Sequence, residues 1–175
     1  RQAEEWLPTQ LEVARPAALV GRVEHEGGAV VVQRGERVQG QGGEDPPALV
    51  FRMRRGVDGA YGPQDPTGTD EVVRRLKIAA RRAEQAEVIL GLESWLSAED
   101  TLRIMDRVGS PAVKMYYDVC NSTDRGYDIY KEIRQLGKER ICEFHMKENG
   151  CLLGKGPVSF EKVRDAINDI GYTGW

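Results

Sequence analysis

Three side chains of metal-ligand type recur at a regular interval in this 175-residue sequence. Glu93, Asp118 and His145 lie 25 and 27 residues apart, and each stands at or near the end of an apolar run. Carboxylates and imidazoles together bind Mn²⁺, Mg²⁺, Co²⁺ or Zn²⁺, and oxygen-rich sets favour the harder ions. The spacing predicts a divalent metal site, although helix caps or solvated loop residues at three strand ends would give the same pattern.

The apolar runs before these residues predict the elements that position them. Residues 88–92 form a run without polar alternation, which is typical of a strand buried on both faces. Two further strands are predicted over residues 112–119 and 140–146. Helical stripes separate them, and Ser97–Asp100 resembles a capping box that begins one helix. Strands alternating with helices indicate a parallel α/β sheet, either an open doubly wound sheet or a (β/α)8 barrel. In a barrel, the carboxyl ends of the strands converge on one active-site face.

Further signals mark where individual helices and strands begin and end. Thr69 or Asp70 is expected to cap the first helix, and Gly137 to end a later one. Gly174 and Trp175 are expected to open a further strand. No glycine-rich phosphate turn follows any predicted strand, which disfavours a dinucleotide-binding fold.

Composition excludes several classes of partner. No apolar stretch approaches the ~20 residues of a membrane span, and no segment resembles a signal peptide. A net charge of −3 provides no basic surface for nucleic acid. Three cysteines, Cys120, Cys142 and Cys151, suit a reducing cytoplasm better than a disulfide framework. We therefore expect a cytoplasmic protein with neither nucleic acid nor membrane as partner.

Residues 68–175 resemble the sugar phosphate isomerase/epimerase proteins of the xylose-isomerase-like TIM-barrel superfamily. The resemblance implies the C-terminal half of a (β/α)8 barrel and a metal-dependent sugar or sugar-phosphate isomerase or epimerase of carbohydrate metabolism. Such enzymes transfer a proton through an enediolate. Six segments carry the resemblance: residues 88–93, 116–121, 126–129, 144–148, 153–156 and 171–175.

The resemblance also implies a role for individual residues. It makes Glu93, Asp118 and His145 the ligands of a divalent metal, Mn²⁺, Mg²⁺, Co²⁺ or Zn²⁺, and makes Glu93 a catalytic acid/base. Glu99 matches an acidic position of the substrate site. Asn121 stands where the epimerases usually have a substrate-binding histidine.

The loop after the histidine contributes two more expected substrate contacts. Lys147 and Asn149 are expected to contact substrate hydroxyls or phosphate, whereas a solvated loop lysine would fit the pattern as well. Cys151 stands near a place where the epimerases often have an arginine. The family's fourth ligand, a glutamate on the last strand, would follow Trp175 by a few residues. We therefore expect a fragment with an incomplete site and weak or no turnover.

Two other functions fit the same resemblance. The first is a non-catalytic, truncated half-barrel. Such a half-barrel would expose a sheet edge, and it could form a homo-oligomer. The second is an endonuclease-IV-like phosphodiesterase. It is disfavoured because it needs several histidines and a basic surface, whereas this chain contains only His25 and His145.

The first 67 residues differ in composition from the rest. No Lys or Ile precedes Lys77 and Ile78, whereas seven Lys and eight Ile follow from there. Residues 19–23 and 29–33 read as a hairpin, and the rest is expected to be irregular or poorly ordered. We hypothesise that residues 16–67 are not native to the family, for instance because of a shifted reading frame. A divergent or disordered segment is the alternative.

Overall fold

The computed structural model describes residues 21–23, 30–34, 48–53 and 66–175, with side chains from residue 69 onward. Predictions for most of residues 1–67 therefore lie outside the described residues. From residue 48 onward, each strand is followed by one helix or, after the third of these strands, by two. In chain order they are β1 (Gly21–Val23), β2 (Val30–Arg34), β3 (Ala48–Met53), α1 (Pro66–Gln85), β4 (Ile89–Glu93), α2 (Ala98–Val108), β5 (Val113–Asp118), α3 (Val119–Asp124), α4 (Ile129–Arg140), β6 (Ile141–His145) and α5 (Phe160–Asp169).

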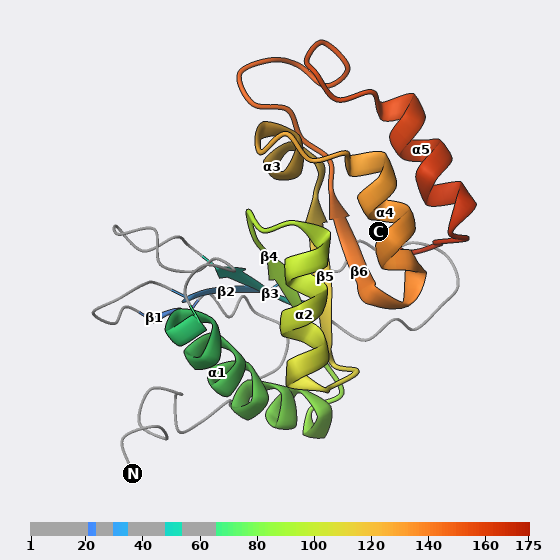
Figure 1. The fold of residues 1–175 in the computed structure, drawn as a ribbon. Helices are drawn as coiled ribbons and strands as arrows, with labels where there is room; N and C mark the ends of the chain where they lie inside the picture. Colours follow the sequence, from blue (N-terminus) through green and yellow to red (C-terminus); the bar gives the residue numbers. More distant parts are fainter. Residues whose placement is uncertain (1–20, 24–29, 35–47, 54–65) are drawn as a thin grey trace.

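The strands form one sheet in chain order, from β1 to β6 (Figure 1). β3, β4, β5 and β6 are parallel, as the strand–helix alternation predicted, so their carboxyl ends share one edge. The three predicted strands are confirmed as β4, β5 and β6. β1 and β2 pair antiparallel, with Gly21 opposite Val32, as expected for a hairpin. The described part is therefore α/β, with a parallel sheet extended by an antiparallel pair.

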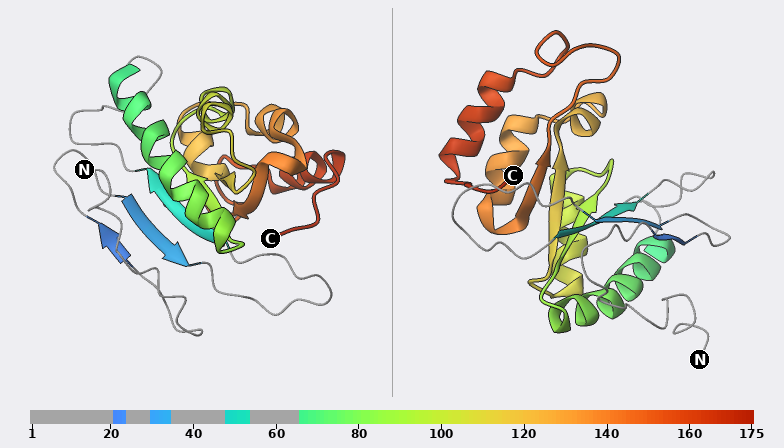
Figure 2. Two further views of the ribbon diagram at one scale, coloured as in Figure 1. Left: turned by 90° about the horizontal axis from the view of Figure 1, so that it is seen from below. Right: turned by 180° about the vertical axis from the view of Figure 1, so that it is seen from behind.

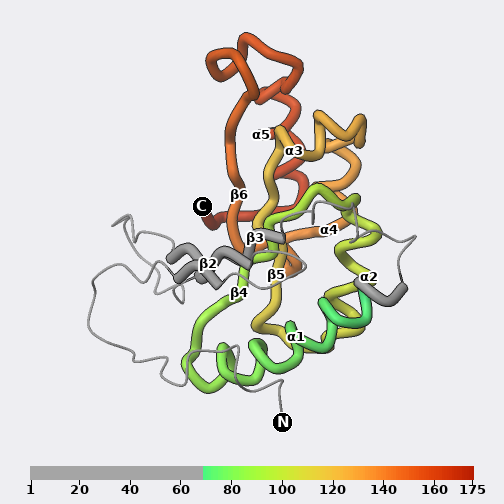
Figure 3. Tube along the Cα trace, turned by 90° about the vertical axis from the view of Figure 1, so that its left-hand side faces the viewer, coloured from blue at the N-terminus to red at the C-terminus, as the bar shows by residue number. Residues whose placement is uncertain are grey.

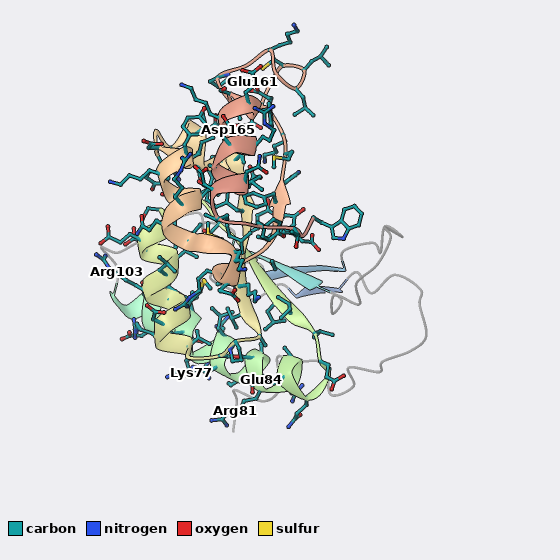
Figure 4. All side chains as sticks on the ribbon, turned by 90° about the vertical axis from the view of Figure 1, so that its right-hand side faces the viewer. Lys77, Arg81, Glu84, Arg103, Glu161 and Asp165 are labelled. Atoms are coloured by element: carbon teal, nitrogen blue, oxygen red, sulfur yellow. The ribbon has the colours of Figure 1, made fainter. Side chains whose placement is uncertain are left out.

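The helices pack on one face of this sheet (Figure 2). α1, α2 and α4 contact β4, β5 and β6, and α5 packs on α4. Apolar side chains at helical spacing, such as Val73, Leu76 and Ala83 on α1, are buried in the core. The charged residues labelled in Figure 4 are exposed on α1, α2 and α5, on the sides of these helices away from the core. This arrangement leaves the carboxyl ends of the strands as the place for a site.

Local sequence signals explain most of the helix boundaries. The Ser97 hydroxyl accepts a hydrogen bond from Asp100 N (3.1 Å), as the capping-box pattern predicted, and it also donates one to Asp100 Oδ2 (2.8 Å). Gly137 has φ 66° and interrupts the helical conformation within α4, as expected for a stop. The predicted start of the first helix was wrong. α1 begins at Pro66, because proline suits a first turn whose backbone N–H groups have no helical acceptor.

One buried carboxylate connects three of the elements that surround the site. Glu132 on α4 accepts hydrogen bonds from the Tyr117 hydroxyl on β5 and from Ala98 N at the start of α2, both at 2.8 Å. Burial, followed by the nearby Glu132 carboxylate, raises the pKa of Tyr117, so this hydroxyl stays protonated and donates. The contact fixes β5, which carries Asp118, against two helices.

The last residues of the chain lie beside β6. Phe144 N donates a hydrogen bond to the Trp175 carbonyl (2.8 Å), and the Tyr172 hydroxyl donates one to the Cys142 carbonyl (2.6 Å). Residues 172–175 do not form the strand expected at Gly174 and Trp175, although they occupy its place next to β6. Among the described residues, no helix combines the length and apolarity needed to cross a membrane.

Candidate metal centre

The three predicted ligands meet at the carboxyl edge of the parallel sheet. Glu93 ends β4, Asp118 ends β5 and His145 ends β6. β5 and β6 are paired in a register that places Asp118 directly opposite His145. Their convergence follows from the parallel topology, because equivalent strand ends lie side by side at one edge.

The ligand atoms of these residues form a compact group, the triad of Glu93, Asp118 and His145. One ligand atom from each side chain lies within 4.8 Å of the other two. His145 Nδ1 is 3.0 Å from Asp118 Oδ2 and 3.8 Å from Glu93 Oε1. The two carboxylates are buried and the imidazole is partly exposed. Two buried carboxylates with an imidazole nitrogen are the donors that divalent ions use.

Two of these atoms are buried without a hydrogen bond. Asp118 Oδ2 and His145 Nδ1 are shielded from solvent and lie 3.0 Å apart, and neither makes a hydrogen bond. The charge of Asp118 Oδ2 is compensated in part by an ion pair with Lys147 Nζ at 2.9 Å. Buried polar atoms are nearly always satisfied, so a buried imidazole nitrogen that faces two carboxylates without a hydrogen bond calls for a bound water or ion. A divalent ion shared by both atoms would satisfy them, and the residues present therefore fit a metal.

The second oxygen of Asp118 has a structural function. Asp118 is the N-cap of α3, and its Oδ1 accepts hydrogen bonds from Cys120 N (3.0 Å) and Asn121 N (2.8 Å). The sequence analysis did not anticipate α3, since six residues are too few for a helical stripe. The cap orients the carboxylate so that Oδ2 faces His145 and the other oxygen faces the backbone.

Lys147 reaches back from the loop after β6 to the same carboxylate. Its Nζ lies 2.9 Å from Asp118 Oδ2 and donates a hydrogen bond to Asn121 Oδ1 (3.0 Å). The structure thus brings two predicted substrate residues, Asn121 and Lys147, to the triad. The β6–α5 loop that carries Lys147 lies at the same end of the sheet as α3 (Figure 3).

The other two predicted substrate residues make contacts outside the triad. Glu99 is exposed in the first turn of α2 and forms an ion pair with Arg103. Asn149 is also exposed, and its amide donates a hydrogen bond to Asp124 on α3. Asn149 therefore connects the β6–α5 loop to α3 by a hydrogen bond, whereas Glu99 is paired with Arg103 on the surface of α2.

The structure adds one neighbour of the triad, Tyr116, that the sequence analysis missed. The Tyr116 ring lies 5.8 Å from the His145 ring, centroid to centroid, and partial burial raises the pKa of Glu143. Tyr116 stands two residues before Asp118, and Glu143 stands two residues before His145. Side chains two positions apart on a strand point to the same face, so strand alternation would have predicted both. Trp95, two residues after Glu93, is exposed, and the Arg125 guanidinium lies 5.4 Å from its ring centroid.

Comparison with known proteins assigns the family. The family model described as xylose isomerase-like TIM barrel matches residues 47–175, and the chain belongs to this family. The fold is therefore a partial TIM barrel, as predicted, and the open doubly wound sheet is excluded. The match begins at residue 47, ahead of the predicted start of the resemblance at residue 68, and it includes β3.

Individual relatives are similar to this chain at low sequence identity. A D-psicose 3-epimerase from Enterocloster bolteae is 28% identical over 111 residues, which cover 58% of this chain and 36% of that protein. The structure of an L-ribulose 3-epimerase matches with a TM-score of 0.59 and 23% identity over 66% of this chain and 41% of its own. The structure of a family 2 AP endonuclease from Brucella melitensis matches with a TM-score of 0.58 and 12% identity, covering 72% of this chain and 52% of its own. The chain thus spans about a third of the curated relative's length and about half or less of these two structures.

Proposed function

We propose that this chain carries the metal centre and the catalytic base of a metal-dependent sugar isomerase or epimerase. The observation that supports this most is the convergence of Glu93, Asp118 and His145 within 4.8 Å, with two of the atoms buried and lacking hydrogen bonds. The similarity to a D-psicose 3-epimerase favours a ketose as the substrate, either free or phosphorylated.

The proposed reaction moves a proton next to a carbonyl group. Removal of that proton leaves negative charge, which is tolerable only when it moves onto the oxygen as an enediolate. A divalent ion in the centre supplies the positive charge that stabilises this oxygen. Asp118 and His145 would hold the ion, and Glu93 would contribute one oxygen to it. Glu93 is also the proposed base that takes the proton, and such a well-placed group increases the rate by ~10²–10⁴-fold.

Polar side chains next to the triad are suited to hold the substrate. Lys147 and Asn121 present an ammonium and an amide at the edge of the centre, where hydroxyl or phosphate oxygens are expected to bind. Asn149 is placed on the same loop, within reach of α3. The substrate role of Glu99 stays a prediction, because its carboxylate is paired with Arg103 on the exposed side of α2.

The donor set argues against a phosphodiesterase of the endonuclease-IV type. Such a site would need several imidazole ligands, and the sequence contains two histidines, one of which, His145, belongs to the triad. The similarity to the AP endonuclease structure is at 12% identity and concerns the fold alone. The isomerase or epimerase reaction therefore fits the site better.

Asp118→Asn separates metal binding from helix capping. Asparagine caps helices as well as aspartate does, so its oxygen can keep the bonds to Cys120 N and Asn121 N, while an amide nitrogen replaces Oδ2. We expect the affinity for Mn²⁺, measured by calorimetric titration, to fall at least ~100-fold, with α3 retained, since even outer-shell changes cost 10–100-fold.

The matched control is Asp128→Asn. Asp128 caps α4 through Lys131 N in the same way but lies outside the triad, so Mn²⁺ affinity should not change. Equal Mn²⁺ affinity in the wild type and in Asp118→Asn would refute the proposed centre.

A further inference from the structure

Lys147 holds a positive charge inside the proposed metal centre. Its Nζ forms an ion pair with Asp118 Oδ2 at 2.9 Å, the same oxygen that lies 3.0 Å from His145 Nδ1. The Asp118 side chain is fully buried, whereas 29% of the Lys147 side chain is exposed. Because Lys147 contacts a buried ligand oxygen, it does not behave as a solvated loop residue.

The position of this ammonium is fixed from two elements. Lys147 follows β6 two residues after His145, and its Nζ also donates to Asn121 Oδ1 in the first turn of α3. Asp118 and Asn121 are in turn linked, because Asn121 N donates to Asp118 Oδ1. The ammonium is thus held by the same capping turn that orients the ligand.

The electrostatic consequence depends on whether a metal is bound. Two buried carboxylates in one small centre repel each other, and a buried charge without a partner is strongly destabilising. Lys147 compensates part of this charge in the metal-free protein. A divalent ion held by the triad would lie close to the Lys147 ammonium, and the two cations would repel each other in an environment of low dielectric constant.

We propose that Lys147 is an internal counter-ion that stabilises the metal-free centre and weakens metal binding, so that the metal stays exchangeable. The inference rests on the proposed metal centre and adds a means of regulating its occupancy. It assigns Lys147 a positioning role in the centre that does not depend on contact with substrate.

The test compares Lys147→Met with the wild type in two measurements. Methionine is neutral and of similar length, so the ion pair is lost with little change in volume. In competition with a fluorescent chelator, we expect the dissociation constant for Mn²⁺ to fall about tenfold or more. In EDTA, we expect the thermal midpoint of the same variant to fall, because the carboxylates then lack their counter-ion.

Two further variants keep the test decisive. Lys155→Met removes an exposed lysine of the same loop and should change neither quantity. Lys147→Gln can still donate a hydrogen bond to Asp118 without a charge, so it should fold even if methionine does not, and it should also bind Mn²⁺ more tightly. The opposite signs of the two effects identify a counter-ion rather than a structural contact.

Each unfavourable outcome has a separate meaning. Unchanged or weaker Mn²⁺ binding by Lys147→Met or Lys147→Gln, with normal binding by the wild type, overturns the counter-ion and leaves the proposed function intact. An unchanged midpoint in EDTA for both variants also overturns the counter-ion. Failure of the wild type and of every variant to bind Mn²⁺ overturns the metal centre and the inference together.

Discussion

Glu93→Gln is expected to abolish proton abstraction from a ketose while leaving the chain folded. Glutamine has nearly the same shape and fills the same buried position at the end of β4. It removes a negative ligand of the metal and, at the same time, the proposed base. We expect the rate of substrate exchange to fall at least ~10³-fold, since a positioned base alone is worth ~10²–10⁴-fold.

Deuterium exchange is the measurement best suited to this variant. Incorporation of deuterium from D₂O into D-psicose, next to its carbonyl and with Mn²⁺ added, requires only one base and no return of the proton to the opposite face. Glu161→Gln, the same change on the exposed side of α5, is the control and should exchange like the wild type (Figure 4). Wild-type exchange rates in Glu93→Gln would exclude Glu93 as the base.

Glu132→Ala is expected to produce the largest loss of stability among changes to buried polar groups near the site. The substitution leaves the Tyr117 hydroxyl and Ala98 N buried without their acceptors. Each unsatisfied buried group costs ~1–3 kcal/mol, so the free energy of unfolding should fall by about 3 kcal/mol. Denaturation with urea in the absence of metal measures this directly.

Companion variants show whether the loss comes from the hydrogen bonds. Glu132→Gln keeps an acceptor for Ala98 N and should cost less than Glu132→Ala. Tyr117→Phe should lose about 1 kcal/mol and become nearly neutral in the Glu132→Ala background, because the two groups contact each other. Glu139→Ala, on the exposed side of the same helix, should stay within ~0.5 kcal/mol of the wild type. If Glu132→Ala is as stable as Glu139→Ala, the buried network is not a source of stability.

The strands and the triad could be predicted from the sequence because both depend on strong, local patterns. An unbroken apolar run such as that of β4 has few alternatives to a buried strand. Once the strands are parallel, residues at equivalent ends must lie together, so the spacing of Glu93, Asp118 and His145 carries three-dimensional information. The residue types then indicate the chemistry.

The contacts that complete the site depend on pairs of residues far apart in the sequence. Lys147 meets Asp118 across 29 positions, and Ala98 meets Glu132 across 34. No periodicity marks such a pair, since each member alone resembles a loop or surface residue. The short helix α3 was missed for a different reason, because a capping aspartate followed by six residues also resembles a turn. Tyr116 could have been predicted from the sequence, because strand alternation alone places it on the same face as Asp118.

The most direct test of the metal centre is anomalous X-ray scattering from a crystal of this chain soaked in Mn²⁺. We predict one strong peak bonded to Glu93, to Asp118 through Oδ2 and to His145 through Nδ1, with Oδ1 of Asp118 still capping α3. The peak should disappear in Asp118→Asn crystals soaked in the same way. A wild-type crystal without a peak at these three side chains, or with Mn²⁺ bound only elsewhere, would contradict the proposed metal centre.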